Sequence, residues 1–312
     1  MTLKVVGLAE IEAVATRKLV FDAVRTALVA HAEGRTTMPQ PIALWFADAE
    51  GDCHVKAGHL AGSSHFAVKV ASGFYRNAER GLPTNSGLVL VLDATTGVPA
   101  AVLADEGWLT AWRTAAAGAL VTHALTPADV DEVAVFGTGL QARLQVEWLA
   151  ELRPLSRVRV CGRRSEAVRQ LCADLATAGL KAEPATAAEA AATPCVITAT
   201  PSTSPLAPAE AFSAAVQHVT GIGTDLPGKA ELPPGLFANA TTIATDDHDQ
   251  CLAHGDFGNA VRAGVVGADA DVSAGLVLRD GVPDRSGLTI ADLTGVGVAD
   301  AAVATAVFTH LG

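Results

Sequence analysis

Three charged residues lie in sequence surroundings where a charge needs a partner. Lys69 interrupts the apolar, alternating stretch HFAVKVASGF, and Arg113 stands among small apolar residues in LTAWRTAAAGAL. Asp225 follows an expected strand in VTGIGTDLPGKAEL, at the edge where open α/β sheets bind ligands. Buried cations are costly unless they are paired or bind an anion. The three residues are therefore candidates for a substrate site; the alternatives are an outward lysine, a surface arginine and a turn aspartate.

A glycine turn supplies the second chemical signal. In DEVAVFGTGLQARLQVEWL, which begins at Asp131, an apolar strand leads into GTGLQA and then into an amphipathic helix. Gly137 permits a tight turn, Gly139 lets backbone N–H groups approach a pyrophosphate, and Ala142 lets helix and strand pack closely. This context predicts nucleotide binding, and the alternative is a glycine turn in an empty α/β domain.

The second strand of such a unit selects the nucleotide. An acidic residue at its end would bind the ribose 2′-hydroxyl of NAD, but this chain has Arg163, Arg164 and Ser165 there. Two guanidinium groups and a hydroxyl suit a 2′-phosphate. We therefore favour NADP(H), with NAD(H) as the alternative; the other interpretation of the arginines is that they are solvated surface charges.

Two kinds of element must position these residues. Helical spacing from Leu8 to Gly34 is followed by strand-like pieces (IALWF, CHVKAGHL, HFAVKVAS, GLVLVLDA and PAAVLAD), which predict a mostly antiparallel sheet, and then by an alanine-rich helix around Arg113. From Val133 strands and helices alternate, which predicts a parallel, doubly wound sheet. The tail ends in another alanine-rich helix. The expected fold class is α/β.

Composition excludes several classes of protein. The 312 residues carry a formal net charge of −11, which argues against nucleic acid or an anionic membrane surface as a partner. Five scattered cysteines without a CxxC pair suit reduced thiols in a cytoplasmic protein. We find no signal peptide and no apolar run long enough to span a bilayer. His248 and His254 are six residues apart, on different faces of a helix, so we expect no metal.

Taken in order, the motifs resemble those of the ornithine cyclodeaminase and mu-crystallin family over nearly the whole chain. The resemblance rests on the VK pair at Lys69, RTAAAGA, GTGLQA, GTDLPGKAEL and DLTGVGVAD. It implies a Rossmann domain at 121–287 and an α+β substrate-binding and dimerisation domain formed by 1–120 and 288–312. It also implies a homodimer that acts on a small amino or imino acid.

The resemblance assigns roles to individual residues. Lys69 and Asp225 would be catalytic, Arg113 and Lys69 would bind the substrate carboxylate, and Asp225 would meet the substrate nitrogen; the three would converge on one cavity, assembled by domain closure. The residues expected to contact the nucleotide are Thr84, Gly137, Gly139, Leu140, Gln141, Arg163, Arg164, Ser165, Thr200 and Thr294. The leading interpretation is an NAD(P)H-dependent imino-acid reductase or amino-acid dehydrogenase. The alternatives are a cyclodeaminase that converts ornithine to proline and ammonia with bound NAD⁺, and a non-catalytic NADPH-binding protein.

One departure from the family pattern concerns the carboxylate clamp. Many relatives carry an arginine after the MP element, where this chain has Gln40 and Pro41. Lys56 shares a strand face with His54, and we expect Lys56 to replace the missing cation. The alternative is a solvent-facing lysine at a sheet edge. We find no well-placed acid for the distal amine of ornithine in this strand, where HVK is basic, and a basic clamp suits a second carboxylate better.

Overall fold

The computed structural model describes residues 3–312 and divides into two compact units. One unit contains the chain up to Ala116 together with Val296–Gly312, and the other is Ala117–Gly295. In residues 3–312 no helix combines the length and the apolar character needed to cross a membrane.

The first unit is built on a seven-stranded sheet with the order β1-β7-β6-β5-β4-β2, in which β3 also pairs with β4. Strands β4 to β7 are antiparallel, as the sequence predicts, while β1 joins β7 in parallel. The strands are β1 (Lys4–Gly7), β2 (Thr36–Thr37), β3 (Ile42–Phe46), β4 (Gly51–Leu60), β5 (His65–Phe74), β6 (Asn85–Asp93) and β7 (Pro99–Ala104). The short 3₁₀ helices are η1 (Ala47–Ala49) and η2 (Tyr75–Arg80).

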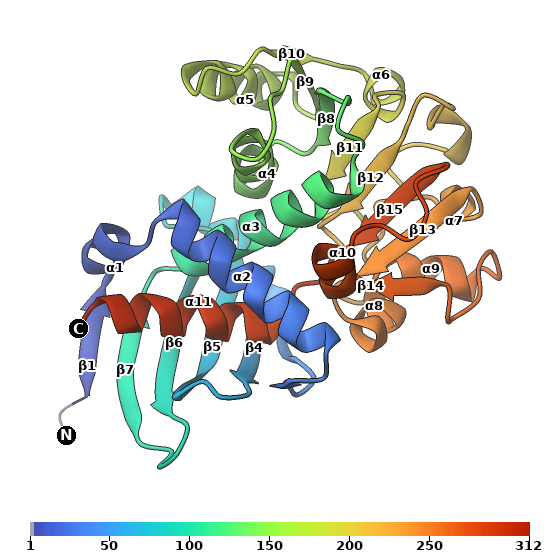
Figure 1. The fold of residues 1–312 in the computed structure, drawn as a ribbon. Helices are drawn as coiled ribbons and strands as arrows, with labels where there is room; N and C mark the ends of the chain where they lie inside the picture. The colour runs from blue at the N-terminus through green and yellow to red at the C-terminus, as the bar shows by residue number, and fades with distance from the viewer. Residues whose placement is uncertain (1–2) are drawn as a thin grey trace. The chain divides into compact units, whose positions relative to one another are not determined.

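Two long helices lie side by side across this sheet, α2 (Arg17–Ala32) and α11 (Gly297–His310) (Figure 1). The single helix expected over Leu8–Gly34 is interrupted, because α1 (Leu8–Val14) ends at an extended Ala15. The Thr16 hydroxyl then accepts the Leu19 N–H and caps α2. The predicted stop at Gly34 is present, with φ of +68°.

Helix α11 approaches the sheet at glycine positions. A Cβ atom on Gly58 of β4 would lie 2.7 Å from the backbone of Val298, and one on Gly297 would lie 2.5 Å from the carbonyl oxygen of Ala57. Only glycine fits at both places, so the start of α11 lies directly on β4. This contact fixes where the residues of the next turn of α11 lie relative to the sheet.

The second unit is the predicted parallel, doubly wound sheet, with the strand order β10-β9-β8-β11-β12-β15-β13-β14. The order reverses direction at β8, between β9 on one side and β11 on the other, which is where such sheets bind nucleotides. The strands are β8 (Glu132–Phe136), β9 (Arg157–Cys161), β10 (Ala182–Pro184), β11 (Cys195–Thr198), β12 (His218–Gly221), β13 (Ala240–Thr245), β14 (Asp271–Ser273) and β15 (Leu288–Asp292).

Strand β15 pairs with β12 and β13 inside this sheet. The second unit therefore continues to Gly295, past residue 288 at which the sequence analysis placed a boundary. The remaining helices are α3 (Trp108–Leu125), α4 (Leu140–Ala150), α5 (Ser165–Thr177), α6 (Ala187–Ala191), α7 (Pro234–Phe237), α8 (His248–His254), α9 (Asp256–Arg262), α10 (Ala274–Asp280) and the 3₁₀ helix η3 (Ala209–Ala211).

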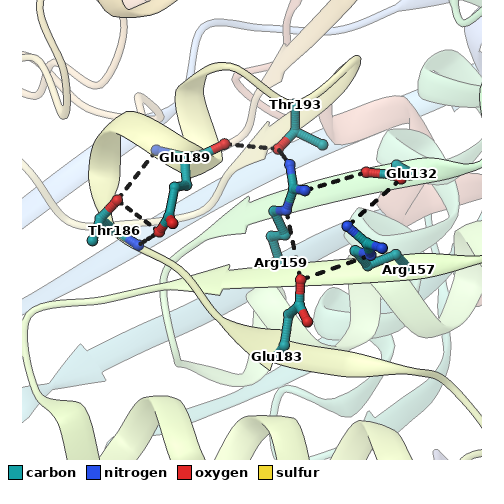
Figure 2. A network of polar contacts seen from close by, with 7 residues as sticks. All are labelled: Glu132, Arg157, Arg159, Glu183, Thr186, Glu189 and Thr193. Carbon is teal, nitrogen blue, oxygen red and sulfur yellow. Dashed lines mark hydrogen bonds and ion pairs between the residues drawn. The ribbon is translucent and has the colours of Figure 1, made fainter.

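A polar network connects β8, β9 and β10 (Figure 2). Arg159 of β9 contacts Glu132 of β8 at 3.6 Å and Glu183 of β10 at 3.7 Å, and Arg157 contacts the same two carboxylates. Arg159 also donates to the Thr193 hydroxyl, at 3.3 Å. Partly exposed ion pairs contribute little stability singly, about 0–1 kcal/mol each. Because these ion pairs connect three strands, they help to hold β9 in register beside β8. They thereby also position the loop that follows β9.

Candidate active site

The first unit holds a buried cluster of charges built from three elements. Arg113 of α3 donates through Nε to Oδ1 of Asp300 on α11 at 2.7 Å, and Lys69 Nζ of β5 forms an ion pair with Oδ2 at 3.0 Å. Lys69 is 3% exposed, and Arg113 and Asp300 are each 5% exposed. The structure therefore brings together the lysine and the arginine that the sequence singled out, and it excludes an outward lysine and a surface arginine.

Asp300, the carboxylate that joins these two cations, was not predicted. It is the last residue of DLTGVGVAD, so the motif was recognised but its acid was given no role. The glycine contacts at Gly58 and Gly297 set the start of α11 against β4, and Asp300 lies in the first helical turn. Burial opposes ionisation of Asp300, but Arg113, Lys69 and Lys56 together hold the pKa of its carboxyl below the ordinary value. Asp300 is thus a buried anion held by cations and by the helix N-terminus.

Lys69 loses its proton at a much lower pH than an ordinary lysine. Its pKa is lowered to about 7, mainly by burial; the attraction of Asp300 opposes this shift, and the charges of Arg113 and Lys56 add to it. The ammonium of Lys69 therefore gives up its proton far more easily than an exposed lysine does. An anion bound beside it would raise this pKa again.

Lys56 lies directly opposite Lys69 in the pairing of β4 with β5. Only 7% of Lys56 is exposed, and β4 is flanked by β5 on one side and by β2 and β3 on the other. Lys56 is therefore neither solvent-facing nor on an edge strand. Its influence on the pKa values of Lys69 and Asp300 places it in the same cluster. Its expected binding of substrate stays a prediction.

The glycine turn in the second unit has the geometry that its motif requires. Gly137 has φ of +122°, and a Cβ there would lie 2.4 Å from the Ala199 carbonyl oxygen, so no other residue fits. Ala142 is fully buried against the sheet. Gly139 precedes α4, and a Cβ there would meet no atom within 4 Å. The open space at Gly139 and the N–H groups at the start of α4 suit a pyrophosphate.

The loop after β9 packs against this turn. A Cβ on Gly162 would lie 2.6 Å from the Thr138 methyl carbon, so the glycine allows the two loops to touch. Arg163, Arg164 and Ser165 follow at once and are exposed. Three basic or hydroxyl residues are thus held beside the glycine turn, where their binding of a 2′-phosphate stays a prediction.

Glu231 connects the loops that follow β11 and β12. The sequence analysis gave this residue no role, although it belongs to the motif GTDLPGKAEL. This buried carboxylate accepts the hydroxyl of Thr198, the N–H and hydroxyl of Thr200 and the N–H of Gly223, at 2.6–2.8 Å. It therefore positions the segment that carries Asp225. Asp225 itself pairs with Lys229 at 2.6 Å, and 44% of its side chain is exposed.

The other residues expected to contact the nucleotide differ in their exposure and in their hydrogen bonds. Leu140 is 47% exposed at the start of α4, and the side-chain oxygen of Gln141 accepts from Gln145 at 3.2 Å. The Thr294 hydroxyl donates to Asp246 at 3.1 Å. Thr84 lies in the first unit, where its carbonyl accepts the Phe74 N–H at 2.8 Å. Thr200 and Thr294 use their hydroxyls internally, and the nucleotide contacts of all these residues stay predictions.

The position of Asp225 relative to Lys69 and Arg113 also stays a prediction, because Asp225 belongs to the second unit and the cations to the first.

His248 forms an ion pair with Asp271 at 2.8 Å. Over residues 3–312, no group of three or more histidine, cysteine or acidic side chains is arranged to hold a metal.

Comparison with known proteins places this geometry in a family. The sequence profile of the ornithine cyclodeaminase/mu-crystallin family matches residues 3–311. The chain belongs to this family. A relative from Sinorhizobium fredii, named as an uncharacterized cyclodeaminase, is 36% identical over 301 residues, which are 92% of this chain and 88% of the relative.

Solved structures of family enzymes share the whole fold. An archaeal alanine dehydrogenase dimer with bound NAD superposes with a TM-score of 0.91 and 29% identity, covering 99% of this chain and 96% of that one. The iminosuccinate reductase of Paracoccus denitrificans in complex with NAD⁺ gives a TM-score of 0.90 and 28% identity, with the same coverage of both chains. The predicted family and fold class are confirmed.

Proposed function

We propose that this protein is an NAD(P)H-dependent reductase of small 2-imino acids, or the corresponding amino-acid dehydrogenase in the reverse direction. The observation that carries the proposal is the buried cluster of Lys69, Arg113 and Asp300, in which cations outnumber the carboxylate. Such a cluster suits the carboxylate of an amino or imino acid. An alanine dehydrogenase and an iminosuccinate reductase are among the similar proteins, which supports this substrate class.

A nicotinamide cofactor fits the second unit. Gly137, Gly139 and the first residues of α4 would hold its pyrophosphate, with Leu140, Gln141, Thr200 and Thr294 nearby. When bound, the reduced nicotinamide supplies the hydride that adds to C2 of the substrate. The solved relatives with NAD bound support a nicotinamide.

The residues of the chain would divide the remaining tasks. Arg113 and the protonated Lys69 bind and orient the substrate carboxylate, and Asp300 holds both cations in place. Asp225 stabilises the protonated imine nitrogen. When C2 accepts the hydride, the π electron pair of the C=N bond becomes the lone pair of an amine, which then takes up a proton. The carboxylate of Asp225, whose side chain is 44% exposed, is suited to passing protons.

Net cofactor turnover tests the proposal. We expect a 2-imino acid generated in situ to consume NADPH or NADH stoichiometrically, as followed by nicotinamide absorbance. A cyclodeaminase, the second candidate, would release ammonia from ornithine or lysine with no net absorbance change. The name of the Sinorhizobium relative favours that candidate, whereas the buried Lys56 disfavours a substrate with a distal ammonium group. Tight NADPH binding without either reaction would indicate the third candidate, a non-catalytic binding protein.

We expect NADPH to bind more tightly than NADH. A hydrogen bond to a charged group contributes about 1.5–3 kcal/mol, so Arg163, Arg164 and Ser165 should give NADPH an advantage of about tenfold or more. Dissociation constants from calorimetry would measure it, and Arg163→Asp should abolish it. Arg169→Asp, a charge reversal at an exposed residue further along α5, is the control. Tighter binding of NADH by the unmodified protein would refute the preference.

We also propose a homodimer, in which β3 contributes to the interface. Among the described residues only β4 pairs with β3, and β3 exposes four large apolar side chains, Ile42, Leu44, Trp45 and Phe46. Strand β3 has no strand partner on its other edge among the described residues, and an apolar edge strand of this kind is favourably covered by a second subunit. A cytoplasmic location is proposed as well, because all five cysteines are free thiols.

Sedimentation at micromolar concentration is expected to show a species of twice 31.7 kDa. Trp45→Asp should shift the population toward monomer, because a charge would have to be buried in the interface. Val98→Asp, at a similarly exposed apolar residue outside β3, is the control. A single 31.7 kDa species in the unmodified protein would contradict the dimer.

A further inference from the structure

The short segment that carries Asp225 is held by two buried carboxylates from different parts of the chain. The N–H of Gly223 donates to Oε2 of Glu231 at 2.8 Å, and the hydroxyl of Thr224 donates to Oδ1 of Asp292 at 3.1 Å. Thr224, Glu231 and Asp292 are completely buried. The two residues immediately before Asp225 are therefore fixed at two separate points, and the position of Asp225 depends on where the two carboxylates lie.

Asp292 connects this segment to a second loop. It is the last residue of β15, where it pairs with Gly221 at the end of β12. Its Oδ2 accepts the Phe257 N–H at 2.8 Å, at the start of α9. A Cβ atom on Gly255 would lie 2.2 Å from this oxygen, so the glycine lets the turn before α9 reach the carboxylate. The two oxygens of Asp292 thus hold two different loops.

Another buried carboxylate, Asp256, lies between the two that hold the segment. Its oxygens accept the N–H groups of Glu231 and Leu232 at 3.0–3.3 Å, and its Oδ2 would lie 3.7 Å from a Cβ atom on Gly221. Each oxygen of Glu231 accepts two hydrogen bonds, which suits an ionised carboxylate. Oδ1 of Asp292 accepts the Thr224 hydroxyl, and its other lone pair can carry a proton.

The surroundings of Asp292 favour the protonated form. Burial is the main cause that raises the pKa of Asp292 to about 7, and the charge of Asp246, which follows β13, adds to the shift against the hydrogen bonds of Phe257 and Thr224. The Cys251 thiol of α8 lies 3.4 Å from the Asp292 carbonyl oxygen, and burial holds the pKa of this thiol well above its ordinary value.

Asp256 responds to the same neighbours. Burial raises the pKa of its carboxyl, and the charges of Asp292 and Glu231 raise it further. Ionisation of Asp292 near neutral pH therefore adds negative charge to a buried place that already holds carboxylates.

We propose that Asp292 is a positioning residue for Asp225 and acts through the hydroxyl of Thr224. The inference rests on the proposed function, in which Asp225 meets the substrate nitrogen. While Asp292 is protonated, the carboxylates that hold the segment keep their spacing. When Asp292 ionises, repulsion by Asp256 and Glu231 acts on the two hydrogen bonds that hold adjacent residues, and Asp225 loses its fixed position.

Removal of the Thr224 hydroxyl tests the connection. Thr224→Val keeps the shape of the side chain, and we expect kcat to fall about 10- to 10²-fold, as for a small misplacement of a reacting group. The dissociation constant of the nucleotide should not change, because the glycine turn is untouched. Thr224→Ser keeps the hydroxyl and should keep most of kcat. Thr245→Val is the matched control, because Thr245 is equally buried but donates to Asp271 of β14.

The pH dependence of kcat tests the role of Asp292 itself. At saturating substrate, whose carboxylate keeps Lys69 protonated, we expect kcat of the unmodified protein to fall about tenfold from pH 6.5 to pH 8.5. Asp292→Asn resembles the protonated carboxyl and cannot ionise, so its kcat should be nearly the same at both pH values. Asp249→Asn, at an exposed residue of α8, should show the decline of the unmodified protein. An equal decline in Asp292→Asn would overturn the role of Asp292.

Amide hydrogen exchange separates this inference from the proposed function. In the whole protein without substrate, the peptide containing residues 223–225 should exchange faster in Thr224→Val than in the unmodified protein, Thr224→Ser or Thr245→Val. Unchanged exchange or unchanged kcat in Thr224→Val would overturn the connection through Thr224. Absence of turnover by the unmodified protein would instead overturn the proposed function, and the exchange measurement would still decide the inference.

Discussion

Replacing Asp300 by asparagine is expected to destabilise the protein by about 3–5 kcal/mol, as is usual when one partner of a buried ion pair is removed. The amide cannot balance Arg113, which stays charged at any accessible pH, and it leaves Lys69 without its anion. Urea unfolding followed by circular dichroism would measure the loss. Asp22→Asn, which removes an exposed partner of Lys18, is the control and should cost about 0–1 kcal/mol.

The loss in Asp300→Asn should depend on pH. The pKa of Lys69 is about 7 in the folded protein, far below the ordinary lysine value of 10.5. The attraction between Asp300 and Lys69 is therefore fully present below pH 7 and is lost as pH rises through that value and Lys69 becomes neutral. We expect a larger destabilisation at pH 6 than at pH 9, with the Arg113 contribution remaining at both. Equal unfolding midpoints of the variant and the unmodified protein would show that the cluster does not stabilise the fold.

Asp225→Asn is expected to lower kcat by about 10²–10⁴, the usual contribution of a positioned acid or base. The amide can neither carry a proton nor balance the charge of an iminium. Nucleotide affinity, measured by calorimetry, should be retained because the glycine turn is untouched.

The ion pair of Asp225 with Lys229 calls for a matched control. Lys229→Met removes the same contact and keeps the carboxylate. We expect it to cost much less turnover than Asp225→Asn. Equal losses in the two variants would mean that the ion pair, and not the carboxylate itself, is what the reaction needs.

Local patterns in the sequence predicted the features that local physics determines. The alternation around Lys69 predicted a buried lysine, and the strand and helix flanking GTGLQA predicted a glycine turn in which Gly137 has positive φ. The strands β3 to β8 were anticipated as apolar stretches between turn residues. These features depend on neighbours within a few residues.

The features that were missed depend on distant contacts. Asp300 meets Arg113 across 187 positions of sequence, and an aspartate in an alanine-rich helix carries no mark of its partner. Glu231 looks like an ordinary charged residue until its loop folds back on Thr198 and Gly223. The apolar stretch LTIAD was not recognised as β15, because insertion between β12 and β13 is a matter of topology and not of pattern.

The position of α11 at the far end of the chain has a consequence for the order of assembly during synthesis. The second unit is one continuous segment, Ala117–Gly295, so all of its strands are synthesised before α11 begins. The first unit has all seven strands by Ala104, yet it must wait for Gly297–His310. Until then the face of β4 at Gly58 is uncovered, and Lys69 and Arg113 lack their carboxylate. The earliest strands of the first unit therefore stay incomplete until Gly297–His310 has been made, and the cluster of Lys69, Arg113 and Asp300 forms only after the second unit has been synthesised.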